Sequence, residues 1–330
     1  MCLVVVGGAD TIPEKNAAAD AGIPGRTARA ARTVCQDSAM PTTAPMSGQH
    51  DPQWLDRMYN NRELVPDHPE HFRRWAAWSA DALRTQRREI DVRYGGGPNQ
   101  HLDIFPAADA GAPVLVFIHG GYWRALDKRE HAFVAPPFTR EGACVVIPNY
   151  ALCPAVTVPQ IVLQLVQALA WTWRHIRNYG GDPGRITVAG HSAGGHLAAM
   201  MLACDWTAHA RDLPAGLVQR ALSISGLFDL EPIMHTPFLQ PTLQLTAGQV
   251  LMASPALLPP PARGTLATVC GGAESGEFLR QNELIRAAWG ERAVPVCEAL
   301  PGLNHFSVLD ALVEPGHRLH QLALQLLRSE

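Results

Sequence analysis

Short apolar runs alternate with longer amphipathic segments along most of the chain. Runs rich in Val, Ile and Leu that end at Gly, Pro or Asn are typical of buried strands, and the longer segments between them are typical of helices. The predicted strands are Ile90–Tyr94, His101–Phe105, Val114–Ile118, Cys144–Pro148, Ile186–Ala189, Ala221–Ser225, Leu266–Cys270 and Val294–Leu300. The first two predict an antiparallel pair. The alternation of strand and helix after them predicts a mostly parallel sheet with helices on both faces.

Helices are predicted between the strands and at both ends of this pattern. The clearest are Pro159–Tyr179, Ala193–Cys204 and Pro315–Arg328. Before the first strand, residues 52 to 86 predict two helices with several aromatic side chains, Trp54, Tyr59, Phe72, Trp75 and Trp78. These helices either cap an active site or simply pack their aromatic side chains on the core. Residues 231 to 263 are rich in proline and interrupt the alternation, so we expect them to form one wall of a pocket.

This pattern also predicts how the chain divides. Residues 1 to 48 contain a stretch rich in Ala, Gly, Thr and Pro. We expect them to be a disordered or non-native extension, with a transit peptide as the alternative. Residues 49 to 330 predict a single domain, in which 49 to 88 form the cap helices and 231 to 263 the pocket wall. With 330 residues, of which 47% are hydrophobic, the chain can bury one large core.

Charge and cysteine content exclude several classes of protein. The formal net charge is −3 and no block of basic residues occurs, which argues against nucleic acid or an anionic membrane as a partner. No apolar run reaches the length of a membrane span. The seven cysteines are scattered and form no C-x-x-C pair, so we expect free thiols and a reducing, cytoplasmic location. Because neither zinc-ligand spacing nor a phosphate loop is found, no metal and no cofactor are expected.

A serine stands where a predicted strand meets a predicted helix. Ser192 lies in Gly190-His191-Ser192-Ala193-Gly194. A serine on such a sharp turn is typical of the nucleophile elbow of α/β-hydrolases. The flanking glycines are needed because the turn strains the backbone and brings neighbouring chain segments close. We therefore predict that Ser192 is a nucleophile.

A glycine pair follows an earlier strand and predicts an oxyanion loop. His119-Gly120-Gly121-Tyr122-Trp123 comes directly after Val114–Ile118. The amides of Gly121 and Tyr122, together with that of Ala193, are expected to bind the oxyanion of a tetrahedral intermediate. Tyr122 and Trp123 are candidates for substrate contact, with a core anchor as the equal alternative for Trp123.

The remaining members of a catalytic triad should follow the last two strands. His305 comes after Val294–Leu300 and is predicted to be the general base. Glu274, in the loop after Leu266–Cys270, is the preferred acid, and Asp229 and Glu277 remain alternatives.

Three histidines close to the glycine motifs are expected to support the site. His119 should brace the oxyanion loop through hydrogen bonds. His191 and His196 flank the serine and are expected to pack beneath the site, although His191 is also a candidate for substrate contact.

These motifs make the chain resemble the α/β-hydrolase-type kynurenine formamidases, or arylformamidases, within the hormone-sensitive-lipase-like esterases. The resemblance rests on His119–Trp123, Gly190–His196 and Glu274–Gln281, and the segments Tyr59–Arg62 and Val65–His68 are similar to the family's N-terminal cap. It covers roughly residues 50 to 330.

The resemblance implies an α/β-hydrolase fold with an N-terminal helical cap, and it implies that Glu274 is the triad acid. Here glutamate replaces the family's more usual aspartate, and Gly276 replaces a proline. The implied activity is hydrolysis of an aryl formamide such as N-formylkynurenine, a step of tryptophan catabolism, through an acyl-enzyme on Ser192. A general carboxylesterase is the first alternative, and a non-catalytic hydrolase-fold binding protein is the remote one. The expected partner is a small aryl amide or ester, and a homodimer is allowed for.

Overall fold

Eight strands form one sheet at the centre of the molecule. The structure is a computed structural model and describes residues 51–329. The strands are β1 (Glu89–Arg93), β2 (His101–Phe105), β3 (Ala112–Ile118), β4 (Cys144–Pro148), β5 (Gly181–His191), β6 (Arg220–Ile224), β7 (Thr265–Gly271) and β8 (Val296–Leu300). Their order across the sheet is β1-β2-β4-β3-β5-β6-β7-β8. β2 is antiparallel to β1 and to β4, and all other pairs are parallel. The predicted mostly parallel sheet is therefore confirmed.

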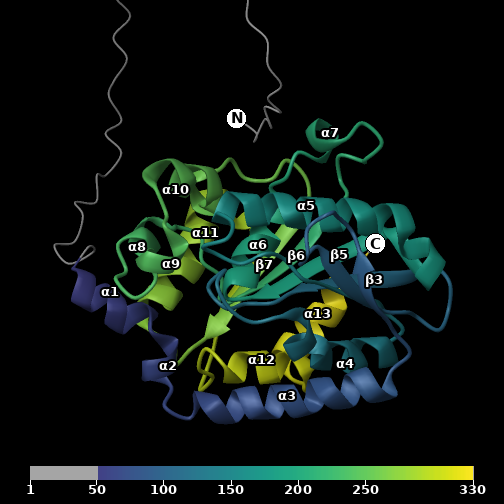
Figure 1. Ribbon diagram of the computed structural model, residues 1–330, viewed down its shortest axis with the longest axis horizontal. Coiled ribbons are helices and arrows are strands. Elements are labelled where there is room, and N and C mark those ends of the chain that lie inside the picture. The colour runs from purple at the N-terminus through teal and green to yellow at the C-terminus, as the bar shows by residue number, and fades with distance from the viewer. Residues whose placement is uncertain (1–50, 330) are drawn as a thin grey trace, which may run out of the picture.

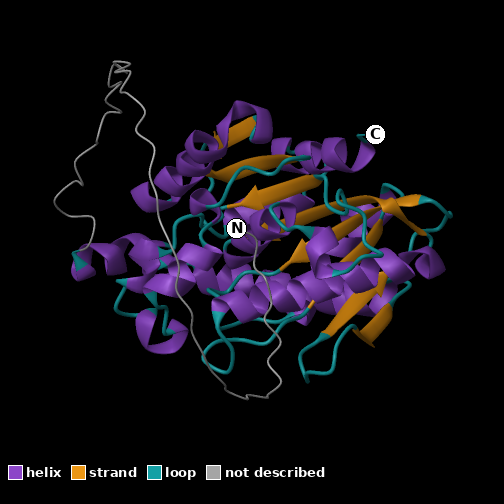
Figure 2. Cartoon of the chain, turned by 90° about the horizontal axis from the view of Figure 1, so that it is seen from above, coloured by secondary structure: helices purple, strands orange, loops and turns teal. Residues whose placement is uncertain are grey.

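Helices cover both faces of this sheet, with α5, α6, α10 and α11 above it and α3, α4, α12 and α13 below it in Figure 1. Figure 2 looks down on the upper layer and shows the strands fanning out across the molecule. The α-helices are α1 (Pro52–Tyr59), α2 (Asn61–Leu64), α3 (His68–Thr85), α4 (Ala135–Arg140), α5 (Val158–His175), α6 (Ala193–Leu202), α7 (Trp206–His209), α8 (Glu231–Met234), α9 (Gln240–Leu243), α10 (Ala247–Ala253), α11 (Gly276–Ala293), α12 (Ser307–Val313) and α13 (Arg318–Arg328). Three 3₁₀ helices are η1 (Lys128–Val134), η2 (Ile176–Tyr179) and η3 (Pro255–Leu257).

The central strands are apolar on both faces because each face meets a layer of helices. Alternate side chains of a strand point to opposite faces. In β3, Val114 and Val116 join the hydrophobic cluster that includes α5 and α6. Leu115 and Phe117 join the cluster that includes α3, α12 and α13. The near-continuous apolar runs of the sequence thus reflect a sheet with two cores.

The N-terminal region contains three helices where two were predicted. α1 ends at Tyr59, because the ψ of 74° at Asn60 leaves the helical range, and the four-residue α2 begins at Asn61. α3 packs on the lower layer, where Trp75 is 3% exposed and stacks on Phe133 with the ring centroids 5.8 Å apart. Trp75 therefore serves the core, whereas Trp78 of the same helix is 40% exposed. α1 and α2 lie instead beyond the end of β7, at the left of Figure 1.

The proline-rich segment from 231 to 263 folds into α8, α9, α10 and η3. Its Phe238 contacts the oxyanion loop, since the rings of Phe238 and Tyr122 are 6.1 Å apart, edge to face. The amide of Phe238 also donates to Asp56 of α1 at 3.1 Å. The segment therefore lies against both the N-terminal helices and the predicted oxyanion loop. The predicted extension, residues 1 to 48, lies outside the described residues.

Candidate active site

Ser192 lies at the turn between β5 and α6 in a strained backbone conformation. Its φ and ψ are 57° and −119°, values that L-residues rarely adopt. A Cβ atom on Gly190 would lie 2.1 Å from the carbonyl oxygen of Gly194. A Cβ atom on Gly194 would lie 2.0 Å from the carbonyl oxygen of Ile118. Both glycines are therefore required for this turn, as expected from the motif.

Glu274 and His305 meet in a buried pair. Glu274 Oε2 is 2.6 Å from Nδ1 of His305, and their side chains are 0% and 5% exposed. Glu274 Oε1 accepts two further hydrogen bonds, from the hydroxyl of Ser225 at 2.5 Å and from the amide of Gly271 at 2.6 Å. A carboxylate held in this way fixes the histidine ring and stabilises its protonated form. Nε2 of His305 remains available to exchange a proton.

The two alternative acids are held elsewhere. Glu277 accepts a hydrogen bond from the hydroxyl of Tyr59 at 2.6 Å and pairs with Arg280 at 2.8 Å. Asp229 accepts from the amide of Glu231 at 3.1 Å and lies 3.7 Å from Arg280. Burial raises the pKa of Asp229. Of the three carboxylates considered from the sequence, the structure brings Glu274 to the histidine.

Ser192 lies beside the oxyanion loop, and the residue before it contacts the loop of His305. Its Cβ lies 3.1 Å from the position that a Cβ on Gly120 would take, so the oxyanion loop passes directly beside it. The preceding His191 contacts the loop of His305, with Nε2 2.8 Å from the His305 carbonyl oxygen. Within residues 51–329, no hydrogen bond joins the Ser192 hydroxyl to His305. Catalytic hydrogen bonds commonly tighten only when substrate is bound.

The oxyanion loop has an unusual backbone. Gly121, Tyr122 and Trp123 have φ values of 105°, 48° and 54°. A Cβ on Gly121 would lie 2.1 Å from the carbonyl oxygen of Ala125, so only glycine fits there. Among the described residues, the amides of Gly121, Tyr122 and Ala193 donate to no protein acceptor. Ala193 is the first residue of α6, where backbone amides have no partner within the helix.

His119 holds this loop from below, as expected. Its ring stacks on Tyr150 with the centroids 4.3 Å apart, and its Nδ1 lies 2.9 Å from the carbonyl oxygen of Gly120. The hydroxyl of Tyr150 donates to the carbonyl oxygen of His119 at 2.9 Å. Burial lowers the pKa of His119, which favours the neutral ring.

Of the three candidates for substrate contact, two are turned toward the protein. Trp123 is 0% exposed, and its Nε1 donates to Nδ1 of His196 at 3.2 Å, so its contacts are those of a core anchor. His191 is 4% exposed and contacts His305, both through its Nε2 and through its ring, with the centroids 4.7 Å apart. Burial and the neighbouring His305 lower the pKa of His191 well below its usual value. A role in substrate contact stays a prediction for both, and their contacts favour support of the site.

Tyr122 faces the N-terminal helices. Its hydroxyl donates to the carbonyl oxygen of Tyr59, at the end of α1, at 2.7 Å. Burial, and to a lesser extent Glu274, raise the pKa of Tyr122 well above its usual value. The phenol is therefore a neutral hydrogen-bonding group that joins the oxyanion loop to α1.

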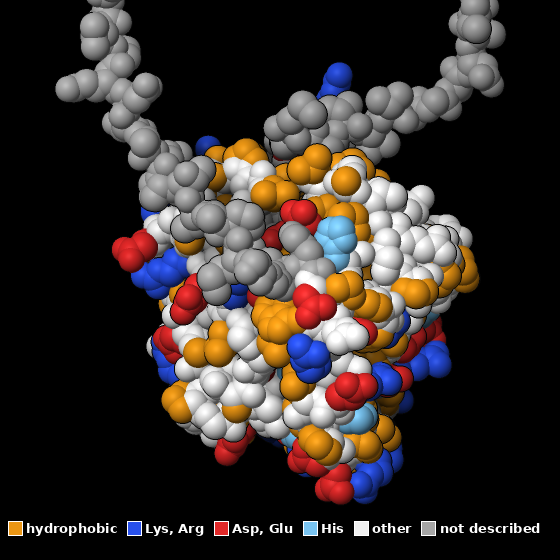
Figure 3. Space-filling view, turned by 90° about the vertical axis from the view of Figure 1, so that its left-hand side faces the viewer, with side chains coloured by type: hydrophobic (Ala, Val, Ile, Leu, Met, Phe, Trp, Pro, Cys, Tyr) orange, Lys and Arg blue, Asp and Glu red, His pale blue; other side chains and the backbone are white. Residues whose placement is uncertain are grey.

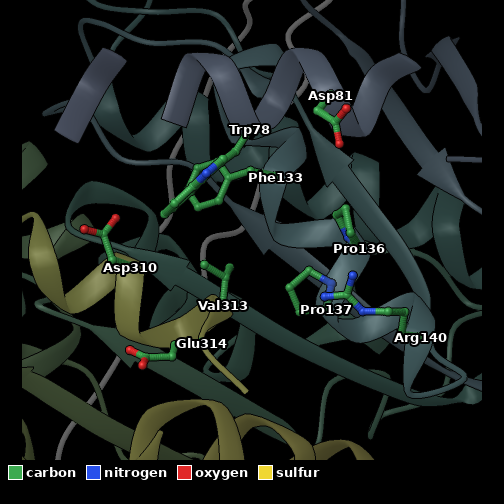
Figure 4. A pocket seen from close by; sticks show the side chains of 9 residues that line it. All are labelled: Trp78, Asp81, Phe133, Pro136, Pro137, Arg140, Asp310, Val313 and Glu314. Carbon is green, nitrogen blue, oxygen red and sulfur yellow. The ribbon is translucent and has the colours of Figure 1, made fainter. Parts of the chain in front are cut away.

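A small cavity adjoins the Glu274–His305 pair. Its volume is about 140 Å³, and its lining residues are Asn61, Leu64, Val65, Ala273, Glu274, Ser275 and His305. A larger cavity, of about 400 Å³, lies between α3, α4 and α12 and is shown in Figure 4. Trp78 and Phe133 form its aromatic wall. None of the predicted catalytic residues lines this larger cavity, so size alone is a poor guide to the active site here.

On the face shown in Figure 3, acidic, basic and apolar side chains are interspersed. Within residues 51–329, no group of three or more His, Cys, Asp or Glu side chains is placed to hold a metal ion. None of the helices described is both long enough and apolar enough to cross a bilayer. Cys144, Cys153 and Cys270 are buried free thiols.

Comparisons with known proteins identify relatives over most of the chain. A family model described as BD-FAE matches residues 102–215. A kynurenine formamidase from Salmo salar is 29% identical over 284 residues, which is 83% of this chain and 92% of the relative. A kynurenine formamidase from Danio rerio is 30% identical over 246 residues, 72% of this chain and 81% of the relative. An esterase from Mycobacterium tuberculosis, LipQ, is 33% identical over 193 residues, 53% of this chain and 43% of that protein.

Solved structures share the fold. A protein from Silicibacter sp. TM1040, provisionally described as a thioesterase, superposes with a TM-score of 0.70 at 30% identity, over 80% of this chain and 97% of that one. An esterase from Pyrobaculum calidifontis superposes with a TM-score of 0.60 at 19% identity, over 83% of this chain and 96% of that one, and shows the fold alone.

Proposed function

Because this chain belongs to the kynurenine formamidase family of α/β-hydrolases, we propose that it cleaves the formamide bond of an N-formyl arylamine such as N-formyl-L-kynurenine. The chain is a hydrolase by family. The observation that carries the proposal is the contact of 2.6 Å between Glu274 and His305 in the chain order serine, acid, histidine. Such a step belongs to tryptophan catabolism.

In the proposed reaction, Ser192 attacks the formyl carbon while His305 takes the hydroxyl proton. The negative oxygen of the tetrahedral intermediate is bound by the amides of Gly121, Tyr122 and Ala193, each worth about 3 kcal/mol. His305 returns the proton to the nitrogen of the departing arylamine, which leaves a formyl ester on Ser192. A water molecule, deprotonated by His305, then releases formate.

Glu274 completes the proposed machinery without moving a proton. Its Oε2 faces Nδ1 of His305, so Nδ1 carries the hydrogen and Nε2 is the atom that exchanges protons. The Ser225 hydroxyl and the Gly271 amide occupy the other carboxylate oxygen. These bonds hold the carboxylate group in the orientation that presents Oε2 to His305.

A general carboxylesterase with the same residues is the alternative, and the matching Mycobacterium esterase favours it. The test is a comparison of kcat/KM for N-formyl-L-kynurenine and for p-nitrophenyl acetate and butyrate with one enzyme preparation. We expect kcat/KM for the formamide to be the higher although its bond is the harder to cleave, because a formamidase stabilises the transition state of that substrate selectively. A good ester turnover with no measurable formamide cleavage would favour the carboxylesterase.

A non-catalytic binding protein is the remote alternative. Labelling by a fluorophosphonate probe separates it from a serine hydrolase, because the probe reacts with an activated serine. We expect labelling of the unmodified protein and none of Ser192→Ala. For the protein itself, the scattered thiols support a cytoplasmic location. Size-exclusion chromatography with light scattering decides whether it forms a homodimer.

A further inference from the structure

We infer that Asn61, on the short helix α2, determines specificity by hydrogen-bonding a polar substituent of the departing arylamine. This inference rests on the proposed function and extends it to the substrate class. The substrates selected in this way are formamides whose aryl ring carries a carbonyl or amino group within reach of the Asn61 carboxamide.

Asn61 lies in the cavity that adjoins the proposed base. Asn61 is 5% exposed, and it lines the 140 Å³ cavity together with Glu274 and His305. Asn61 and His305 therefore face the same small space, although α2 lies far from His305 in the sequence. A cavity of about 140 Å³ is large enough for one aromatic ring.

The carboxamide of Asn61 makes one long hydrogen bond to the described part of the protein. Its Nδ2 is 3.5 Å from the hydroxyl of Tyr122, which is the outer limit for a hydrogen bond. That hydroxyl already donates to the carbonyl oxygen of Tyr59 at 2.7 Å. Among the described residues, no group donates to Oδ1 of Asn61. Oδ1 is not among the fully buried unpaired atoms of the described residues, so it is open to the cavity and available to a bound group.

The other walls of the cavity are either apolar or already engaged. Leu64 and Val65 offer an apolar surface for an aryl ring. Ser275 is polar, but its hydroxyl donates to the carbonyl oxygen of Met58 at 2.6 Å. Glu274 is held by His305 and two other donors. Apart from the proposed base, Asn61 is thus the lining side chain that has hydrogen-bonding atoms available for a polar group of a ligand.

The position of the cavity points to the departing amine rather than the formyl group. His305 must pass its proton to the amine nitrogen, so the amine lies on the side of the imidazole. His305 lines the cavity, whereas Ser192 and the predicted oxyanion donors Gly121 and Ala193 do not, so the cavity lies on the side of the base away from the acyl group. A ring placed there rests on Leu64 and Val65, with its substituent near Asn61.

The helix that carries Asn61 is fixed to the site, as a specificity residue requires. The Tyr122 hydroxyl binds the carbonyl oxygen of Tyr59, and the Ser275 hydroxyl binds that of Met58. The Tyr59 hydroxyl in turn donates to Glu277 at 2.6 Å. The end of α1 is therefore bonded to both the oxyanion loop and the segment after Glu274, which places α2 between them.

The test compares two formamides in two variants. The substrates are N-formyl-L-kynurenine, which carries a ring carbonyl, and formanilide, which carries no substituent. For Asn61→Leu we expect kcat/KM for the substituted formamide to fall about 5- to 10-fold more than for formanilide, as for the loss of one hydrogen bond. Asn60→Leu is the matched control, because Asn60 is adjacent but does not line the cavity, and its ratio should equal that of the unmodified enzyme. An equal fall for both substrates in Asn61→Leu would overturn the inference.

A binding measurement separates this inference from the proposed mechanism. L-kynurenine, the arylamine product, is titrated by calorimetry into Ser192→Ala with and without Asn61→Leu. We expect Kd to rise about 5- to 10-fold with Asn61→Leu, and an unchanged Kd would overturn the role of Asn61. Full activity of Ser192→Ala would overturn the serine mechanism and leave this comparison of Kd values valid. If Asn61→Leu does not fold, Asn61→Ala replaces it with the same expected ratios.

Discussion

The ring of His191 donates a hydrogen bond from Nε2 to the backbone carbonyl oxygen of His305, at 2.8 Å. A carbonyl oxygen only accepts, so the hydrogen is on the His191 nitrogen. His191 immediately precedes Ser192 at the end of β5, and His305 lies in the loop after β8. This bond therefore joins the segment that carries the proposed nucleophile to the loop that carries the proposed base.

Removal of this bond should lower the rate of reaction more than substrate affinity. For His191→Leu we expect kcat to fall about 10-fold with KM little changed, because the bond positions the His305 loop and contacts no substrate. The measurement is steady-state kinetics on N-formyl-L-kynurenine and on p-nitrophenyl acetate. A rise in KM at constant kcat would instead identify His191 as a substrate-binding residue.

Replacement of the proposed acid should disable the proposed base. In Glu274→Gln, the amide removes the charge that stabilises the imidazolium, and we expect kcat to fall by about 10⁴-fold. Glu274→Asp keeps the charge but is shorter by one methylene, so a smaller loss is expected. Both are measured with p-nitrophenyl acetate, with Glu291→Gln as a surface control. Near-normal activity of Glu274→Gln would remove this carboxylate from the mechanism.

The elbow glycine should not tolerate even one methyl group. A Cβ on Gly194 meets backbone at 2.0 Å, so Gly194→Ala should lower the melting temperature and the free energy of unfolding, by roughly 3 kcal/mol or more. The control is Gly248→Ala in α10, where the nearest atom is 4.0 Å from the added Cβ. That change should stabilise the protein by about 0.5–1 kcal/mol, because alanine is the better helix former. Equal effects of the two substitutions would contradict this account of the elbow.

Stability should fall as the pH falls below the usual pKa of histidine. Burial lowers the pKa of His196 to about 4, and its Nε2 donates to the carbonyl oxygen of Ala253 while its Nδ1 accepts from Trp123. The unfolded chain then binds more protons than the folded chain below about pH 6.5, so the stabilisation is complete above that pH and is lost toward pH 4. From pH 7.5 to 5 we expect His196 alone to cost roughly 2 kcal/mol.

This pH dependence is measured as the free energy of unfolding in urea at several pH values. The slope should be shallower in His196→Asn, which lacks the titrating group. His119, His131 and His191 have lowered pKa values from the same cause and contribute to the remaining slope. A free energy that does not change between pH 7.5 and 5 would contradict the prediction.

Much of the fold and of the site could be predicted because the short apolar runs that predict strands also precede the site residues. Each predicted site residue follows an apolar run, and parallel strands bring their carboxyl ends to one edge of a sheet. The candidate pairing of Glu274 with His305 could be predicted for this reason, although they lie in separate loops. Their contact in the structure comes from the register of β7 and β8.

Other features depend on distant contacts that leave no local signal. Ser225 was predicted only as the last residue of a strand, yet its hydroxyl binds Glu274. Ser225 directly follows β6, and its amide donates to Val269 of β7, which brings it beside the loop of Glu274. For Trp123 the sequence favours a core anchor and a substrate contact equally, and its complete burial favours the core anchor. The break at Asn60, which divides the first predicted helix, depends on how α1 and α2 dock onto the site.

The docking of α1 and α2 has a consequence for how such enzymes diversify. In our proposal the stretch that selects the amine precedes the central sheet, while the bond-cleaving groups come from loops that follow later strands. The short segment that contains α1 and α2 can then be exchanged without changing the catalytic groups. Replacing this segment with that of a relative of different substrate specificity is therefore a direct way to change the substrate. Tyr122 and Ser275, whose hydroxyls bind the end of α1, must be retained.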